Sequence, residues 1–213
     1  FEIPCILRVR GNELTSDSNA YLKHCESEGA SLEFMDREAY KHQKYSDELI
    51  SYLNKTWLSV PEGGASELGL KGCLEIISNE MDFDIIALAQ GTTTTSLGVL
   101  LSSKPSTEVW AFPVLKGFDS ISEMDALARK FNYTNQWLVA KSRLKCFDAY
   151  HFSGYAKNQE ALNTAINDLK IDGNFTLDPI YTAKAFIGMI SQLQHIKQPK
   201  KVLFIHTGGV LPV

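Results

Sequence analysis

The sequence predicts an α/β protein with an open, mostly parallel β-sheet, divided into two domains. Short apolar runs rich in β-branched and aromatic residues alternate with longer amphipathic stretches, which is the pattern of repeated strand–helix units. With 44% hydrophobic residues among 213, the chain can bury a sizeable core. The sequence Pro61-Glu-Gly-Gly interrupts the pattern after Val60. We place the domain boundary there, which gives domains 1–59 and 60–213.

Strands are expected where a short apolar run is bounded by turn residues, and helices where apolar residues recur every three or four positions. The predicted strands are Cys5–Val9, Leu32–Met35, Trp57–Val60, Asp84–Ala89, Glu108–Leu115, Gln136–Ala140 and Val202–His206. The predicted helices are one from a cap at Asp17 or Ser18 to about Glu28, then Ser46–Asn54, Glu67–Glu80, Thr95–Leu101, Ser122–Phe131, Asn158–Leu169 and Pro179–Gln194. Because so few strands precede Pro61, we expect the first domain to be incomplete.

Composition excludes several classes of function. Lys and Arg number 21 against 25 Asp and Glu, and no long basic run offers a surface for nucleic acid. No apolar stretch approaches the ~20 residues that span a bilayer, so we expect no membrane segment. The cysteines show no metal-binding or disulfide spacing, which fits a cytoplasmic protein without a metal site.

The most informative segment is the predicted strand that begins at Asp84 and runs into Gly91-Thr-Thr-Thr-Thr before a helix. Free backbone N–H groups from Gly91 to Thr95, together with the positive end of the helix dipole, favour an anion. No lysine follows the turn, so a single monophosphate fits better than a nucleoside triphosphate. The alternative is that the threonine hydroxyls only cap the helix.

Two tyrosines are candidates for proton transfer. Tyr181 precedes Thr182 at the start of a predicted helix, where the positive helix end favours an ionised phenol. Tyr155 lies beside a glycine in His151-Phe-Ser-Gly-Tyr-Ala. Each could equally be a half-buried packing residue. His151 and His206 are as easily structural as catalytic, and His206-Thr-Gly-Gly alone is a weak signal of a ligand site.

Taken in order, five segments resemble the pyridoxal-phosphate-dependent 1-aminocyclopropane-1-carboxylate deaminase / D-cysteine desulfhydrase family: PEGGASELGLKG, GTTTT, HFSGYA, LDPIYTAKAFIGM and FIHTGG. The resemblance implies a three-layer, two-domain α/β fold of the tryptophan synthase β type, with pyridoxal 5'-phosphate between the domains. It places Gly91, Thr92, Thr93, Thr94 and Thr95 at the cofactor phosphate, Thr182 and Thr207 near the pyridine ring, and Tyr155 and Tyr181 facing a small amino-acid substrate. It also makes a homodimer the expected assembly.

The resemblance also bears on the substrate. Deaminase members have an acidic residue after the second tyrosine and a leucine in place of the threonine of HTGG, whereas Thr182 and Thr207 stand here, as in desulfhydrase-like members. A neutral hydroxyl near the ring nitrogen suits β-elimination, so we expect D-cysteine or a related D-amino acid to give a keto acid, ammonia and sulfide. Deamination of 1-aminocyclopropane-1-carboxylate is the alternative. A dehydratase of the same superfamily is a more distant one, against which the tyrosine pair argues.

The family's cofactor-binding lysine falls before Phe1 in this comparison. We therefore expect that these 213 residues alone do not complete a catalytic cycle. A hypothesis of another class is a truncated pseudoenzyme, a non-catalytic module that keeps the phosphate loop.

Overall fold

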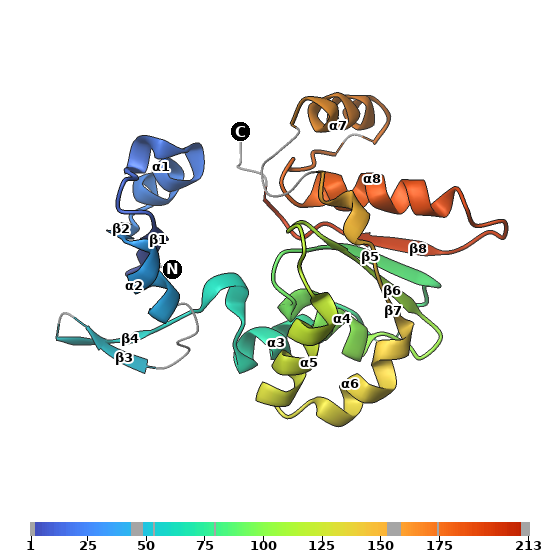
Figure 1. The fold of residues 1–213 in the computed structure, drawn as a ribbon, viewed down its shortest axis with the longest axis horizontal. Coiled ribbons are helices and arrows are strands. Elements are labelled where there is room, and N and C mark those ends of the chain that lie inside the picture. The colour runs from blue at the N-terminus through green and yellow to red at the C-terminus, as the bar shows by residue number, and fades with distance from the viewer. Residues whose placement is uncertain are drawn as a thin grey trace. The chain divides into compact units, whose positions relative to one another are not determined.

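The computed structural model describes residues 3–43, 49–52, 54–78, 80–152, 159–173 and 175–209. Contacts between residues divide the chain into two compact units, Phe1–Glu62 and Gly63–Pro212. In Figure 1 the first unit runs from blue to cyan and the second from cyan-green to red.

The first unit contains a βαβ motif and a hairpin. Strands β1 and β2 pair in parallel, with Ile6 beside Ser31 and Arg10 beside Met35, and α1 connects them. Strands β3 and β4 pair antiparallel. The bounds are β1 Ile6–Arg10, η1 Ser16–Ser18, α1 Ala20–Ser27, β2 Ser31–Met35, α2 Arg37–Gln43, β3 Leu49–Tyr52 and β4 Lys55–Leu58. Leu22 is buried, but the apolar side chains of β1 and β2 are only half-buried, so the described core of this unit is thin.

The second unit is a four-stranded parallel sheet between two layers of helices. The strand order is β7-β6-β5-β8, and neighbouring strands of this sheet pair in parallel. The bounds are η2 Glu62–Gly64, α3 Glu67–Leu74, β5 Ile85–Gln90, α4 Thr94–Ser102, β6 Glu108–Pro113, α5 Ser120–Lys130, α6 Thr134–Ala140, η3 Lys141–Arg143, β7 Leu144–Cys146, η4 Asp148–His151, α7 Gln159–Gly173, α8 Thr182–Leu193 and β8 Val202–Ile205. This arrangement confirms the predicted α/β class.

Strand β5 is buried along its whole length because helices cover both faces of the sheet. Ile86 and Leu88 point into a core shared with α3 to α6, whereas Ile85 and Ala87 point into a core shared with α8. Alternate side chains of a strand face opposite sides, which explains why β5 is apolar throughout. Figure 1 shows α3 to α6 on one side of the sheet and α8 on the other.

Among the described residues, no helix is long and apolar enough to cross a membrane.

Two predicted elements are wrong. Gln136–Ala140 was expected as a strand, but it lies in α6, where Trp137 and Ala140 are buried while Val139 is 80% exposed. This spacing of three belongs to a helix, although the apolar run resembles a strand. The predicted helix Ser46–Asn54 is also wrong over its described part, because Leu49–Tyr52 forms β3. Its pairing with β4 overrides the local helical pattern.

Several boundaries also shift. The strand expected at Trp57–Val60 occupies Lys55–Leu58, and α3 ends at Leu74 rather than near Glu80. Pro179 lies in the turn before α8 and not within the helix.

The C-terminal end of α4 is closed by an arginine from a distant part of the chain. The Arg143 guanidinium donates to the carbonyls of Leu100 at 2.8 Å, Lys104 at 2.9 Å and Thr107 at 2.9 Å, and to the Ser103 hydroxyl at 2.9 Å. These carbonyls lie at and just after the end of α4, where backbone acceptors lack partners within the helix. Arg143 therefore holds α4 in place from its C-terminal end.

We expect Arg143→Met to destabilise the protein by about 2–3 kcal/mol, because it leaves several half-buried carbonyls without a donor. Urea unfolding followed by tryptophan fluorescence measures the change. The matched control is Arg129→Met, which removes an ion pair with Asp125 from a side chain that is 70% exposed. The control substitution should lower the free energy of unfolding by less than about 0.5 kcal/mol. Equal effects of the two substitutions would contradict the role given to Arg143.

Candidate functional site

The candidate site lies at the carboxyl edge of the parallel sheet, where three segments meet. They are the loop from Gly91 after β5, the turn before α8, and the loop after β8. A methyl group added at Gly91 would lie 2.8 Å from Cε1 of Tyr181, and one added at Gly209 would lie 2.9 Å from the Asp178 carboxyl carbon. The site is thus built at the end of an open α/β sheet where ligands usually bind.

A buried glutamine fixes the loop after β5. The Gln90 side chain is 1% exposed; its amide donates to Ser96 Oγ at 3.0 Å and accepts from Ser120 Oγ at 2.8 Å. Ser96 Oγ in turn donates to the Thr93 carbonyl at 3.2 Å. The end of β5 is therefore joined to the first turns of α4 and α5.

The threonines of this loop have different surroundings. Thr92 Oγ1 donates to the Gly63 carbonyl at 3.5 Å, and Thr95 Oγ1 accepts from the Cys73 thiol at 3.9 Å. Burial raises the pKa of Cys73, which favours the neutral thiol that donates here. The side chain of Thr93, at the N-cap position of α4, makes no capping hydrogen bond.

Thr94 is the threonine of this loop whose surroundings indicate a ligand. Its residue is 1% exposed, and its hydroxyl is buried with no hydrogen-bond partner among the described residues. A buried polar group without a partner costs about 1–3 kcal/mol. The first N–H groups of a helix also lack partners within that helix. A phosphate placed at the start of α4 would satisfy the Thr94 hydroxyl and these amides together, so the residues present fit such a group.

Glycines in the turn before α3 allow the close approach of the threonine loop. Gly63 has φ +67°, and a methyl group there would overlap the side chain of Thr92. Gly64 has φ +63°, but a methyl group there would meet nothing within 4 Å. The two positions carry the same backbone strain and differ in their contact with the loop.

This pair gives a controlled test of the loop. Gly63→Ala and Gly64→Ala should both lower the free energy of unfolding by about 1–2 kcal/mol, because alanine is strained in a left-handed backbone conformation. Only Gly63→Ala should also displace Thr92 and weaken binding of inorganic phosphate or pyridoxal phosphate, by about tenfold. Thermal unfolding and isothermal titration calorimetry separate the two effects. Equal loss of binding in both variants would contradict the packing of Gly63 against the loop.

A buried aspartate builds the first turn of α8. The Asp178 side chain accepts from the backbone N–H groups of Ile180 at 2.9 Å, Tyr181 at 2.8 Å and Thr182 at 2.8 Å, and from the Thr182 hydroxyl at 2.6 Å. The Asp178 N–H donates back to the Thr182 hydroxyl at 2.9 Å. This reciprocal cap fixes the backbone of Tyr181, whose ring packs against Gly91 and the core shared with α8.

The structure brings some of the predicted site residues together. Gly91 and Tyr181 are in contact, and Thr92 to Thr95 surround the start of α4. Thr182 is fully buried and its hydroxyl is engaged by Asp178. Thr207 is exposed on the loop after β8.

Tyr155 lies outside the described residues. His206 is structural in this arrangement, because its Nε2 pairs with the Thr176 carbonyl at 2.9 Å and its Nδ1 accepts from the Gly208 N–H at 3.2 Å.

Sequence reasoning missed the contribution of Asp178 and of Gly63. The signal for Asp178 was present, since an aspartate followed directly by proline is typical of a residue that caps a helix or turn. The contact between Gly63 and Thr92 joins segments 29 residues apart, so no local pattern could reveal it.

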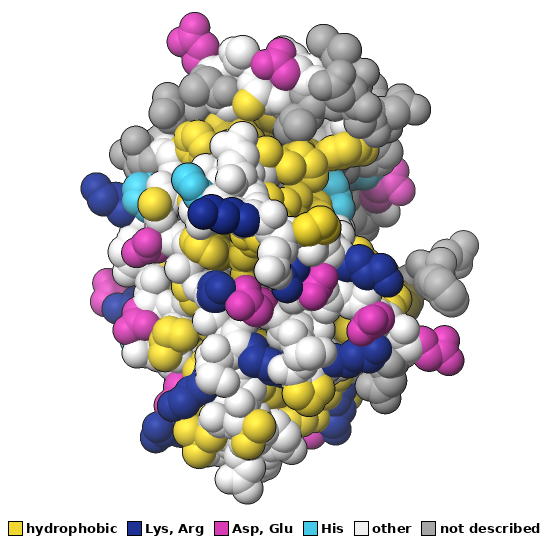
Figure 2. Space-filling model, turned by 90° about the vertical axis from the view of Figure 1, so that its right-hand side faces the viewer, with side chains coloured by type: hydrophobic (Ala, Val, Ile, Leu, Met, Phe, Trp, Pro, Cys, Tyr) yellow, Lys and Arg dark blue, Asp and Glu magenta, His cyan; other side chains and the backbone are white. Residues whose placement is uncertain are grey.

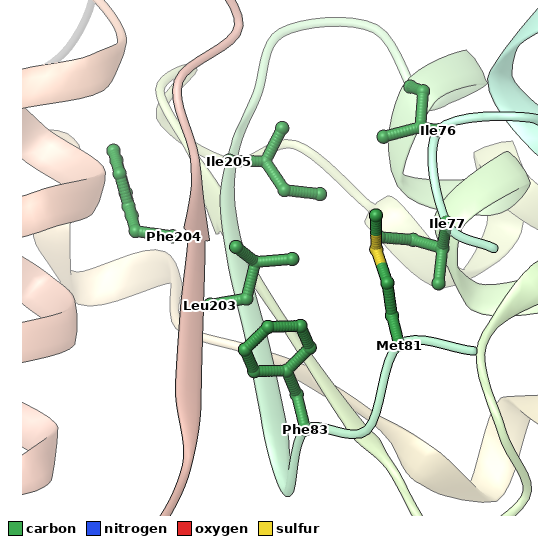
Figure 3. Close-up of a pocket in the computed structure, with 7 residues that line it drawn as sticks. All are labelled: Ile76, Ile77, Met81, Phe83, Leu203, Phe204 and Ile205. Carbon is green, nitrogen blue, oxygen red and sulfur yellow. The ribbon is translucent and has the colours of Figure 1, made fainter. Parts of the chain in front are cut away.

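An apolar pocket of about 340 Å³ lies elsewhere in the second unit. Figure 3 shows side chains from the segment after α3 on the same side of β8 as Leu203 and Ile205, whereas Phe204 points to the other side of the strand. The lining residues are Ile76, Ile77, Met81, Phe83, Leu203, Phe204 and Ile205. The lining has no charged or hydroxyl side chain, so this pocket offers no group that would bind phosphate or transfer a proton.

One face of the molecule is displayed in Figure 2, where acidic and basic side chains are intermingled among the coloured residues. Among the described residues of that face, the basic side chains form no continuous surface. Within the described ranges, no cluster of His, Cys, Asp and Glu could hold a metal ion.

The fold and the site define an α/β protein with a candidate anion-binding loop, beside a tyrosine, at the carboxyl edge of a parallel sheet. No profile of a known protein family matches the chain. Individual relatives do. A Thermotoga maritima protein provisionally named 1-aminocyclopropane-1-carboxylate deaminase is 32% identical over 164 residues, 71% of this chain and 51% of the relative. A Klebsiella pneumoniae D-cysteine desulfhydrase is 28% identical over 70% of this chain and 49% of its own length.

A crystal structure described as that of an ACC deaminase homologue matches with a TM-score of 0.77 at 24% identity, over 98% of this chain and 66% of that one. This match supports the fold. The named relatives, the Thermotoga maritima protein above all, show that the chain belongs to the 1-aminocyclopropane-1-carboxylate deaminase / D-cysteine desulfhydrase family. The chain spans about half the length of the curated relatives that it matches.

Proposed function

We propose that this chain forms the phosphate-binding part of a pyridoxal-phosphate-dependent enzyme that performs β-elimination on D-cysteine or a related small D-amino acid. The observation that carries the proposal is the Thr94 hydroxyl at the start of α4, which is buried and has no hydrogen-bond partner among the residues that the structure describes. A ligand with phosphate oxygens supplies the acceptors that this hydroxyl and the neighbouring amides need. The named relatives add support for this class of enzyme.

In this scheme the Gly91–Thr95 backbone and the Thr94 hydroxyl hold the cofactor phosphate. When bound, pyridoxal phosphate supplies an electron sink for a substrate carbanion. Tyr181 lies against Gly91, so its phenol stands beside the phosphate loop, where its Oη can take or give a proton. Thr207 on the loop after β8 faces the ring in the family scheme, and Tyr155 is proposed as a second proton-transfer group.

The preference for D-cysteine rests on the neutral residues Thr182 and Thr207. Thr182 is hydrogen-bonded to Asp178 inside the cap of α8. In the family scheme it places an uncharged side chain near the pyridine ring. The products would be a keto acid, ammonia and sulfide. Relatives named for 1-aminocyclopropane-1-carboxylate deamination make that reaction the second candidate. We also propose a homodimer in the cytoplasm as the working form.

The role of Thr94 can be tested without activity. Thr94→Val removes a hydroxyl that has no partner, so the ligand-free protein should be equally stable or more stable, by up to about 1–3 kcal/mol. The same substitution should weaken pyridoxal phosphate binding by about tenfold. Calorimetry and thermal unfolding with and without the ligand measure both effects.

The control is Thr107→Val, whose hydroxyl donates to the Phe83 carbonyl at 2.7 Å. It should lower stability by about 1 kcal/mol and leave binding unchanged. If Thr94→Val loses stability without losing affinity, the hydroxyl is not part of the phosphate site.

The reaction is tested by incubating the protein with pyridoxal phosphate and D-cysteine and measuring sulfide, with ammonia release from 1-aminocyclopropane-1-carboxylate measured in parallel. We expect sulfide from D-cysteine in the protein that carries this chain, and Tyr181→Phe should lower turnover by about 10²-fold or more because a positioned proton carrier is lost. Cofactor affinity of that variant should stay within about twofold. Ammonia without sulfide would favour the deaminase; binding without turnover would favour a non-catalytic phosphate module.

A further inference from the structure

A lysine is buried in α8, two residues after Thr182. Lys184 is 1% exposed, and its ammonium donates to the His151 carbonyl at 3.0 Å. Burial lowers the pKa of Lys184, and the neighbouring Asp178 carboxylate partly opposes this effect. Burying an ammonium is costly unless it is paired and hydrogen-bonded, so the site must gain from its contacts.

His151, which accepts this hydrogen bond, is the last residue of the short turn η4. The backbone just after this turn is strained. Phe152, immediately after His151, has φ +49°, a left-handed conformation that is unfavourable for a residue other than glycine. Tyr150 in the same turn is hydrogen-bonded to Ser191 at 2.9 Å and to Gln192 at 2.8 Å, both at the far end of α8. The turn is thus attached to α8 at two separate points.

Six residues before Lys184 stands Asp178, the carboxylate that organises the start of α8. Asp178 is 3% exposed and fixes the backbone of Tyr181 and Thr182. A buried carboxylate is stable when a cation balances it. Lys184 and Asp178 are thus two buried, oppositely charged groups at the start of α8.

We infer that Lys184 is a positioning residue that holds the His151 turn against α8 and balances the Asp178 carboxylate, so that Tyr181 keeps its place beside Gly91. Lys184 acts through these residues and not on the phosphate loop itself. The catalytic consequence rests on the function proposed above, whereas the structural consequence does not.

Hydrogen exchange followed by mass spectrometry tests the structural part, with Lys184→Met, Lys184→Gln and, as a surface control, Lys197→Met. In Lys184→Met we expect amides of 148–152 and of 178–183 to exchange about tenfold faster or more, with less than about twofold change in α4 and α5. The amide of Lys184→Gln can still donate to the His151 carbonyl, so only 178–183 should become faster. Lys197→Met should change neither segment.

Tyr150→Phe provides a second comparison, because it releases only the other attachment of the turn. It should speed exchange in 148–152 and leave 178–183 unchanged. If Lys184→Met affects only one of the two segments, or if both charge-removing variants leave 178–183 unchanged, the inference is overturned.

Cofactor binding and turnover complete the test. Lys184→Met should bind pyridoxal phosphate within about twofold of the wild type, while kcat for D-cysteine falls about tenfold through misplacement of Tyr181. Weakened binding with unchanged kcat would contradict a positioning role. If the wild-type protein binds no pyridoxal phosphate, the proposed function fails, and the exchange data still decide the role of Lys184.

Discussion

The loop at the start of α4 depends on the hydrogen bonds of one buried glutamine. Gln90 ends a strand that is buried along its whole length, and its amide joins Ser96 in α4 to Ser120 in α5. An unsatisfied amide at this depth would be costly, so the network fixes a single arrangement of these elements. Arg143 holds the opposite end of α4 through carbonyls that the helix cannot satisfy itself. The helix is thus restrained at both ends, while the hydroxyl of Thr94 stays without a partner.

This combination of a rigid frame and an unsatisfied group is typical of a binding site formed before its ligand arrives. Gly63 lets the turn before α3 pack on Thr92, and Asp178 sets the first turn of α8 so that Tyr181 meets Gly91. Each of these contacts joins segments that are distant in the sequence. The site therefore depends on the packing of the whole second unit rather than on the loop alone.

Much of the second unit could be predicted from sequence because its signals are local. The apolar run before Gly91 and the helical pattern after Thr94 gave β5 and α4 within one or two residues of their observed bounds. Segment Gln136–Ala140 could not be assigned correctly, because its four-residue apolar run fits a strand and a helix equally until Trp137 and Ala140 are seen to share a buried face. The hairpin at β3 depended on pairing with β4, which no pattern within Leu49–Tyr52 reveals.

For the candidate site, the sequence pointed to the Gly91–Thr95 loop and to Tyr181, which the structure brings into contact at Gly91, but not to the residues that support them. Motif order identified Gly91–Thr95 and Tyr181, whereas the burial of Lys184 and the engagement of Thr182 by Asp178 required the packed structure. The expectation that Thr182 faces the pyridine ring assumed a hydroxyl available for hydrogen bonding. In the structure that hydroxyl donates to the Asp178 carboxylate and accepts from the Asp178 N–H, and its place near the ring stays a prediction.

The central claim is that the Gly91–Thr95 loop binds a phosphate group through its amides and the Thr94 hydroxyl. A crystal structure of the protein with pyridoxal phosphate tests it most directly. We expect phosphate oxygens within hydrogen-bond distance, about 2.7–3.2 Å, of Thr94 Oγ1 and the backbone nitrogens at the start of α4. A cofactor phosphate bound elsewhere, with Thr94 Oγ1 still unpartnered, would contradict it.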